Sequence, residues 1–215
     1  MSQTKLKILD AALYLFNTYG LINVRLQHIA DEAGISVGNL AYHYYAKEAI
    51  VKKIDEDLSK LLIPIISENR FFPSLIDFDN QLARYYHMLR NYSFYFLDLL
   101  ELKRAYPKLY RKREVYIKKI IHQIENWFCF NVERGLIIPE IRPKHYQVIA
   151  HTIWMVITFW MTKPLDKGIP EEGERIFKEV VWSQVLPYLT DTGRLEFDLM
   201  IERLLDSYNP EYEVK

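Results

Sequence analysis

Side chains suited to reading a DNA duplex cluster between residues 36 and 47. Asparagine can form two hydrogen bonds to adenine in the major groove, and small apolar groups can contact thymine methyls. Tyrosine and histidine can donate hydrogen bonds to phosphate oxygens, and a lysine adds positive charge. The candidate DNA contacts in this segment are Ser36, Val37, Gly38, Asn39, Ala41, Tyr42, His43 and Lys47. The plainer alternative for each is a solvated surface side chain, but their combination favours DNA contact.

Two short helices separated by a tight turn are expected to position this segment. Apolar residues recur at helical spacing over 26–33, and the small Ala30 lets the second helix approach closely. Gly34 can adopt the left-handed backbone conformation that turns the chain. Ser36 can cap the following helix, which is expected to reach about Tyr44. The pattern therefore predicts a helix-turn-helix whose second helix carries the candidate DNA contacts.

The first 55 residues resemble the N-terminal pattern of the tetracycline-repressor (TetR) family. The matching residues are Ile8-Leu9-Asp10-Ala11-Ala12-Leu13-Tyr14-Leu15-Phe16, Gly20, Ile29-Ala30, Ala33-Gly34-Ile35-Ser36, Gly38-Asn39-Leu40, His43-Tyr44 and Lys47-Glu48-Ala49-Ile50. The resemblance implies a transcriptional regulator, expected to be a repressor that a small-molecule effector releases from its operator. It also adds Arg25 and Gln27, near the start of the second helix, as candidate DNA contacts. Asn39 and Ala41 depart from the usual Thr and Tyr, which alters the preferred operator rather than the binding mode.

The rest of the chain shows helical spacing and no sustained strand-type alternation. A fourth helix is expected from Lys47, ending or kinking at Pro64. Further helices are expected at 74–91, 93–105, 107–134, 143–163, 170–189 and 194–208. The fold class is therefore all-α. Residues 1–46 are expected to form a helix-turn-helix DNA-binding domain, and residues 47–215 a larger helical domain for ligand binding and dimerisation.

The resemblance further implies that the larger domain encloses an effector between its helices. Few charges interrupt the apolar stripes there, so an apolar or aromatic effector is expected. The segment 91–100, followed by Tyr106-Pro107, is also similar to one branch of the same family. The candidate pocket residues are Tyr85, Tyr86, Leu89, Tyr95, Phe96, Trp127, Phe130, Trp154, Thr158 and Met161. Core packing is the alternative for most of them.

Members of this family are typically homodimers, in which the last two long helices form the interface. On that analogy, the candidate interface residues are Ile176, Val180, Val181, Val185 and Leu189. They lie at helical spacing on one stripe. An intramolecular core would give the same stripe, so the spacing does not distinguish the two.

Composition narrows the remaining function classes. The 28 Lys and Arg residues balance the 28 Asp and Glu residues, so the DNA-binding expectation depends on the local segment and not on net charge. The only cysteine, Cys129, is expected to be a small buried hydrophobe. We expect a cytoplasmic protein, because no signal peptide and no apolar run long enough to span a bilayer is recognisable.

Catalytic signatures are not recognisable in the sequence. It contains no phosphate-binding loop, nucleophile elbow, metal-ligand spacing or convincing carboxylate pair. An enzyme, a cofactor and a metal site are therefore not expected. The alternative function is an all-helical small-molecule-binding or interaction protein with the same fold but little useful DNA binding. Salt-dependent binding to DNA would decide between that alternative and a regulator.

Overall fold

The computed structural model describes residues 2–67, 74–160 and 170–207, and their regular secondary structure is helical. The described elements are α1 (Gln3–Tyr19), α2 (Leu26–Glu32), α3 (Val37–His43), α4 (Lys47–Ser67), α5 (Leu75–Asn91), α6 (Ser93–Leu97), α7 (Leu99–Ala105), α8 (Pro107–Glu133), α9 (His145–Phe159), α10 (Pro170–Trp182), the 3₁₀ turn η2 (Leu186–Tyr188) and α11 (Asp191–Ser207). An isolated antiparallel bridge pairs Ile137 with Leu189. The predicted all-α fold class is confirmed.

The chain divides into two compact units. Unit 1 comprises residues 1–67, 87–116 and 158–164, and unit 2 comprises residues 68–86, 117–157 and 165–215. Helices α5, α8 and α9 each contribute residues to both units. Unit 1 thus combines the helix-turn-helix with α6 and α7, which come much later in the chain. The domain boundary after residue 46 stays a prediction.

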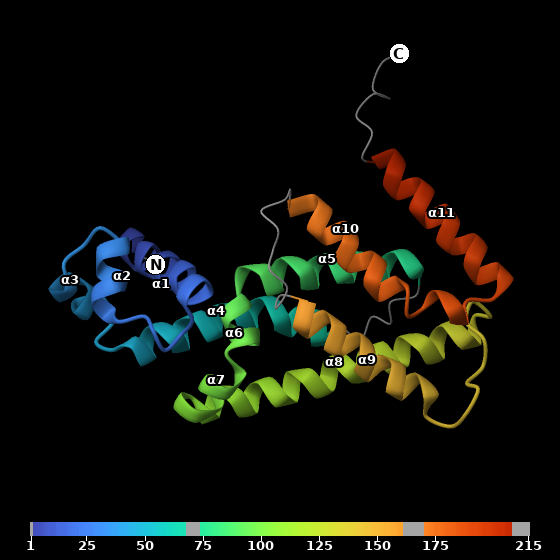
Figure 1. Cartoon of the computed structure of the whole chain (residues 1–215), viewed down its shortest axis with the longest axis horizontal. Helices are drawn as coiled ribbons and strands as arrows, with labels where there is room; N and C mark the ends of the chain where they lie inside the picture. The colour runs from blue at the N-terminus through green and yellow to red at the C-terminus, as the bar shows by residue number, and fades with distance from the viewer. Residues whose placement is uncertain (1, 68–73, 161–169, 208–215) are drawn as a thin grey trace, which may run out of the picture. The chain divides into compact units, whose positions relative to one another are not determined.

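Unit 1 is organised around the inner face of α1. Ile8, Ala12 and Phe16 are fully buried and lie four residues apart, which places them on one side of the helix. The Phe16 ring lies 5.3 Å from the Phe94 ring of α6. Figure 1 shows α1, α2 and α3 grouped around the beginning of α4. Gly20 ends α1 with a positive φ of 79°, a conformation that glycine adopts without strain.

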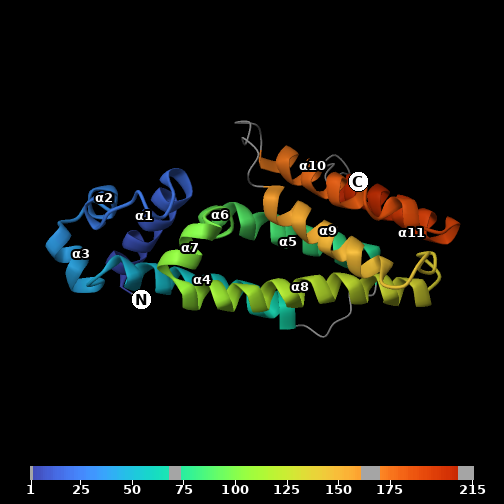
Figure 2. The same cartoon turned by 60° about the horizontal axis from the view of Figure 1, so that its bottom comes forward.

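Aromatic rings form the core of unit 2. Trp127 of α8 stacks on Phe78 of α5 at 4.3 Å, and Trp182 of α10 meets the edge of the same phenylalanine at 5.3 Å. Helix α9 runs beside the second half of α8 in both views (Figures 1 and 2), where Phe128 stacks on Tyr146 at 4.6 Å. These aromatic rings therefore pack against one another inside unit 2.

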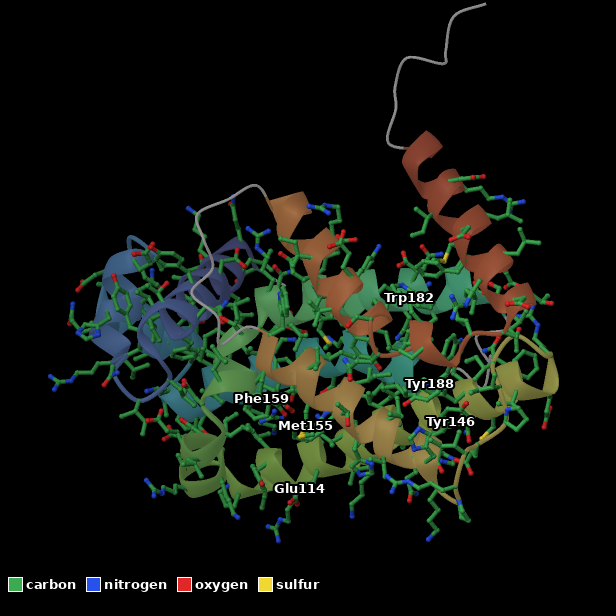
Figure 3. The ribbon with its side chains drawn as sticks, turned by 45° about the vertical axis from the view of Figure 1, so that its right-hand side comes forward. Glu114, Tyr146, Met155, Phe159, Trp182 and Tyr188 are labelled. Carbon is green, nitrogen blue, oxygen red and sulfur yellow. The ribbon has the colours of Figure 1, made fainter. Side chains whose placement is uncertain are left out.

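Hydrogen bonds position several rings of unit 2. The Tyr146 hydroxyl donates to the Ile138 carbonyl at 2.6 Å, and its ring lies 5.7 Å from that of Tyr188. Figure 3 shows Tyr146 of α9 and Tyr188 of η2 beside each other. Trp182 donates through Nε1 to Asp79 at 3.0 Å, and Lys178 pairs with the same carboxylate at 2.9 Å. The polar ends of these residues are therefore satisfied inside the unit.

Three predicted helices differ from those observed. The helix expected over 93–105 is interrupted at Asp98, whose ψ of 42° is not helical and whose carboxylate accepts the Leu21 N–H instead. The helix expected over 170–189 ends at Trp182, and the 3₁₀ turn η2 follows. In contrast, α4 continues past Pro64 to Ser67.

The expectation that Cys129 is buried was wrong, and another expectation lies partly outside the described residues. Cys129 is exposed, because it points away from the side of α8 on which Trp127 and Phe128 are buried. Residues 161–163 of the predicted 143–163 helix lie outside the described residues. Within the described ranges, no helix combines the length and apolar character needed to cross a membrane.

Candidate nucleic-acid interface

The turn between α2 and α3 is held by local hydrogen bonds. The Gly34 amide donates to the Asp31 carbonyl at 3.1 Å, and the Ile35 amide donates to the Ala30 carbonyl at 3.0 Å. Gly34 has a φ of 67°, the left-handed conformation predicted for it. The Ser36 hydroxyl accepts the Asn39 amide at 3.1 Å, which confirms the predicted cap. The direction of α3 is therefore fixed at its first turn.

Helix α3 presents nearly its whole circumference to solvent. Leu40 is its one buried residue and anchors the helix to the rest of unit 1. Gly38, Asn39, Ala41 and Tyr42 are exposed, with 86% of Tyr42 accessible. Val37 and His43 are half-buried. The helix is thus short, capped and outward-facing, as a helix that enters a major groove must be.

Tyr45 is an exposed aromatic residue that the sequence analysis did not single out. It lies between α3 and α4 and is 84% accessible, almost as much as Tyr42. Its position two residues after α3 gives no signal in a helical pattern, and only its exposure distinguishes it. An aromatic ring left in water at this place is a further candidate for contact with the DNA backbone.

A shallow hollow with two lysines lies beside the end of α3. Its lining residues are Ser2, Lys5, Tyr42, His43, Tyr44 and Lys53. The Lys5 ammonium lies over the Tyr44 ring at 5.9 Å, while Lys53 pairs with Asp57 at 2.6 Å. The hollow therefore places the Lys5 ammonium beside the end of α3, whereas the charge of Lys53 is paired with Asp57.

Lys47 is engaged inside unit 1 rather than directed at a duplex. Its ammonium donates to the Val24 carbonyl at 2.7 Å and also to the Leu21 carbonyl. Burial lowers the pKa of Lys47, and the nearby carboxylates of Glu48 and Glu101 only partly oppose this. These bonds connect α4 to the segment between α1 and α2. Lys47 therefore supports that segment, and the phosphate contact of Lys47 stays a prediction.

The two candidates on α2 have different surroundings. Gln27 is exposed, and its amide donates to Asp31 at 2.7 Å across one helical turn. The exposed Arg25 is the N-cap residue of α2, and its backbone amide donates to Nδ1 of His28 at 3.3 Å. The Asn23 side-chain nitrogen, just before α2, donates to the Tyr19 carbonyl at 2.8 Å. Both Arg25 and Gln27 remain predicted DNA contacts.

Helix α6 is bonded to the end of α1. The Asn17 carboxamide oxygen accepts the Phe94 amide and the Ser93 hydroxyl, each at 3.1 Å, and its nitrogen donates to the Asn91 carbonyl at 2.8 Å. At the other end of α6, Asp98 accepts the Leu21 amide at 2.8 Å. The position of α1 therefore depends on α6, a helix outside the helix-turn-helix.

The predicted pocket residues are distributed over both units. Tyr85, Tyr86, Trp127, Phe130 and Trp154 belong to unit 2; Leu89, Tyr95, Phe96 and Thr158 belong to unit 1; Met161 lies outside the described residues. Tyr85 and Trp127 do share a small cavity in unit 2, lined by Phe78, Gln81, Leu82, Tyr85, Gln123, Ile124, Trp127 and Ile157. Its volume of about 10 Å³ matches a single water molecule and is too small for an organic effector.

Three of the predicted dimer-interface residues are buried by their own subunit. Val181, Val185 and Leu189 are at most 4% exposed within the single chain, so other residues of the same chain already cover them. The same helical spacing serves a core or an interface, and the interface role of these residues stays a prediction. Ile176 is exposed and Val180 is half-buried. Leu195 and Leu199, which lie four residues apart on α11, are also exposed.

A capped, outward-facing third helix on an all-α frame defines a helix-turn-helix DNA-binding regulator. Comparisons with known proteins identify the family within this class. Residues 8–54 match the family described as bacterial regulatory proteins of the tetR family, and residues 55–197 match the TetR family described as a bacterial transcriptional repressor. The chain belongs to the TetR family of bacterial transcriptional regulators, and it is a DNA-binding transcriptional regulator. Regulators of this family act as dimers and bind small-molecule effectors.

Individual relatives agree with this assignment. The chain is 28% identical over 156 residues to the HTH-type transcriptional regulator RutR of Escherichia coli K12, covering 72% of each protein. A TetR-family regulator from Marinobacter aquaeolei VT8 superposes with a TM-score of 0.79 at 28% identity, over 94% of this chain and 98% of that one. The ketosteroid transcriptional regulator KstR2 of Mycobacterium tuberculosis has a TM-score of 0.66 at 16% identity, over 89% and 97% of the two chains, and shares the fold.

Proposed function

We propose that the chain is a homodimeric repressor that a small-molecule effector releases from its operator. The outward-facing α3 carries the proposal, because only Leu40 of its seven residues is buried. Two copies of α3 in a dimer would occupy successive major grooves about 34–36 Å apart. Asn39 would contact base edges, Val37 and Ala41 would contact thymine methyls, and phosphate contacts would come from around Tyr42.

The phosphate contacts are better assigned to the hollow beside α3 than to Lys47. Lys5 and Tyr42 both line that hollow. Lys47 has its ammonium on two backbone carbonyls, and moving it to a phosphate would break both bonds. We therefore infer that Lys5, Tyr42, His43 and Tyr45 position the protein on the duplex, while Asn39 reads sequence.

The dimer would form through α10 and α11 of unit 2. Ile176, Leu195 and Leu199 are exposed large apolar side chains on these two helices. Burying such side chains against a partner is favourable by about 25 cal/mol for each Å² removed from water. This pairing retains the predicted interface helices and replaces the residues that the core has already buried.

Effector release would act through α6. Because Asn17 and Leu21 are bonded to α6 and Asp98, a shift of α6 changes where α1 and the recognition helix lie. An effector with an apolar or aromatic body that prefers the shifted conformation would lower operator affinity. Couplings of this kind are typically about 1–3 kcal/mol.

The proposal is tested with an operator selected from random DNA by the wild-type protein. Asn39→Ala should weaken binding to it by about 5- to 150-fold and relax preference at one base position, because a bidentate base contact contributes about 1–3 kcal/mol of discrimination. Tyr42→Ala should weaken binding to all sequences alike. The control is Tyr14→Ala, an exposed tyrosine on α1.

Gel-shift titration at several salt concentrations measures these effects. Unchanged affinity in both α3 variants would refute the assignment of the recognition helix. The absence of any salt-dependent binding by the wild-type protein would favour the alternative of a helical binding protein without DNA recognition.

A further inference from the structure

Arg113 of α8 is a buried cation without a protein partner for two of its donors. The residue is 3% exposed, and its Nε and Nη1 atoms have no hydrogen-bond partner. None of the ion pairs found in the described part of the chain includes it. Removing an ionised group from water is costly unless it is paired and hydrogen-bonded. An arginine held in this way needs an explanation.

The guanidinium of Arg113 lies near two aromatic rings. Its central carbon lies 5.2 Å from the Phe96 ring and 5.8 Å from the Tyr95 ring, both on α6. Cation–π attraction of this kind orients a guanidinium but leaves its N–H groups free to donate. Burial lowers the pKa of Arg113 to about 10, so it still carries its charge at neutral pH.

The Asp55 carboxylate, which is connected to this site through Tyr95, already has a cationic partner. Asp55 of α4 accepts the Tyr95 hydroxyl at 3.0 Å and the Lys112 ammonium at 2.7 Å. Lys112 also donates to the Ser59 hydroxyl at 2.6 Å. Asp55 is thus neutralised by its own lysine, and Arg113 is the positive charge that remains. All five residues of this network belong to unit 1.

We propose that Arg113 binds the carboxylate of an anionic organic effector. The planar guanidinium presents its donors in a fork that matches the two oxygens of a carboxylate, which a lysine cannot do. The inference rests on the proposed effector-controlled function and adds to it the class of ligand: one carboxylate on an apolar or aromatic body. The sequence analysis predicted the body but not the charge.

The location of Arg113 connects such a ligand to the DNA-binding helices. Arg113 contacts the rings of Tyr95 and Phe96, and the adjacent Phe94 is bonded to Asn17 of α1. A carboxylate that draws the guanidinium toward itself changes the contacts that hold α6. The effector site and the helix that supports α1 therefore share one element.

The test compares carboxylates with their neutral amides. Benzoate, phenylacetate and hexanoate, and the amides benzamide, phenylacetamide and hexanamide, are each added to the full chain at matched ionic strength, and the melting temperature is measured. At least one carboxylate should raise the melting temperature by several degrees, and its amide should not. Arg113→Met and Arg113→Lys should abolish the shift, whereas Arg111→Gln, an exposed arginine on the same helix, should retain it.

The free protein provides a second readout. Without a carboxylate, Arg113→Met should melt at the same or a higher temperature than the wild type, because it removes a buried, unpaired charge. A purely structural arginine would give a lower melting temperature. A lower value for the free Arg113→Met protein, equal shifts with the amides, retention of the shift in both Arg113 variants or no shift with any of the three carboxylates would each overturn the proposal.

Operator binding separates this inference from the proposed function. The operator affinity of Arg113→Met should no longer respond to a carboxylate that shifts the melting temperature of the wild-type protein. If the wild-type protein binds no operator but a carboxylate shift depends on Arg113, the repressor proposal fails and the anion site stands. If operator binding is intact and the carboxylate shift is absent, only the anion site fails.

Discussion

Residues of unit 1 have two different roles at α3, the proposed recognition helix: some are exposed to solvent, and others fix the backbone at its start. Asn39 and Tyr42 face solvent and are available to DNA, whereas Gly34 and Ser36 fix the turn from which α3 starts. Lys47 resembles the second kind, because its ammonium is bonded to carbonyls of the segment before α2. The residue type alone suggested a phosphate contact, and its surroundings indicate a structural role.

Lys47→Met should lower the free energy of unfolding by about 1–3 kcal/mol, since it leaves two carbonyls without their charged donor. Urea denaturation measures this loss. The slope of log affinity against log salt should stay unchanged, because no phosphate contact is removed. Lys5→Gln is the counterpart: stability should be unaffected, and the slope should fall by about 1. A reduced slope with unchanged stability in Lys47→Met would restore the phosphate role.

At the scale of elements, hydrogen bonds between helices determine which parts move together. Helix α6 is joined to α1 through Asn17 and to the following segment through Asp98. In unit 2, α5 and α10 are joined by Asp79, which accepts bonds from Lys178 and Trp182. Each of these connections between helices depends on the hydrogen bonds of one polar side chain, so a single substitution can test it.

Asn17→Ala should destabilise the protein by about 1–3 kcal/mol, because the Phe94 amide and the Asn91 carbonyl lose their partners. Urea denaturation gives the value, and gel-shift titration should also find altered operator affinity. Asn23→Ala is the control, since that side chain bonds only to the nearby Tyr19 carbonyl. Equal stability of the two variants would mean that α6 is not held to α1 by this joint.

The Lys178–Asp79 pair should make stability depend on alkaline pH. Burial alone lowers the pKa of Lys178, but Asp79 and Glu174 outweigh it and raise the pKa above the ordinary 10.5. The stabilisation from the charged lysine is then complete below about pH 10.5 and is lost as the pH rises through the raised pKa. Lys178→Met should cost about 3 kcal/mol at pH 7, because it leaves Asp79 buried without its cation.

Urea denaturation of the wild type and Lys178→Met from pH 7 to pH 11 tests this. The difference between them should shrink above pH 10.5. Arg175→Gln, which removes an exposed pair with Glu179, should change stability by less than about 1 kcal/mol at every pH. A difference that stays constant up to pH 11 would show that the charge of Lys178 does not stabilise the fold.

At the scale of the whole molecule, the proposed dimer presents two copies of α3 while the net charge of each chain is zero. One copy of α3 carries few side chains that can form hydrogen bonds or ion pairs with DNA. A dimer converts the second half-site contact into an intramolecular event, which raises affinity without any new residue. Quaternary structure is therefore expected to contribute as much to operator binding as the chemistry of α3.

The double variant Leu195→Glu and Leu199→Glu should dissociate the dimer, because it places two charges on each copy of the proposed interface. Sedimentation analysis should give a monomer, and operator affinity should fall by at least about tenfold. Leu100→Glu, at an exposed leucine of α7, is the matched control and should leave both unchanged. An intact dimer in the double variant would exclude this face of α11 as the interface.

The sequence alone determined the local features of this protein. Gly34 and Ser36 act on the backbone of their own neighbours, so the turn, the cap and the exposed α3 follow from residue types and spacing. The all-α class follows in the same way from helical periodicity. The domain-like pattern of the first 55 residues was sufficient to indicate the family.

Tertiary structure decided what depends on contacts between distant segments. The carbonyl partners of Lys47 lie 23 and 26 residues earlier in the chain. The helix is interrupted at Asp98, whose carboxylate accepts a hydrogen bond from the Leu21 amide, 77 residues earlier. The burial of Val181, the exposure of Leu195 and the unpaired state of Arg113 likewise depend on which helices pack together. Helical periodicity shows that a helix has an apolar side. Only the tertiary structure determines what packs against that side, because the same apolar stripe can contact the core of its own chain, a partner chain or a ligand.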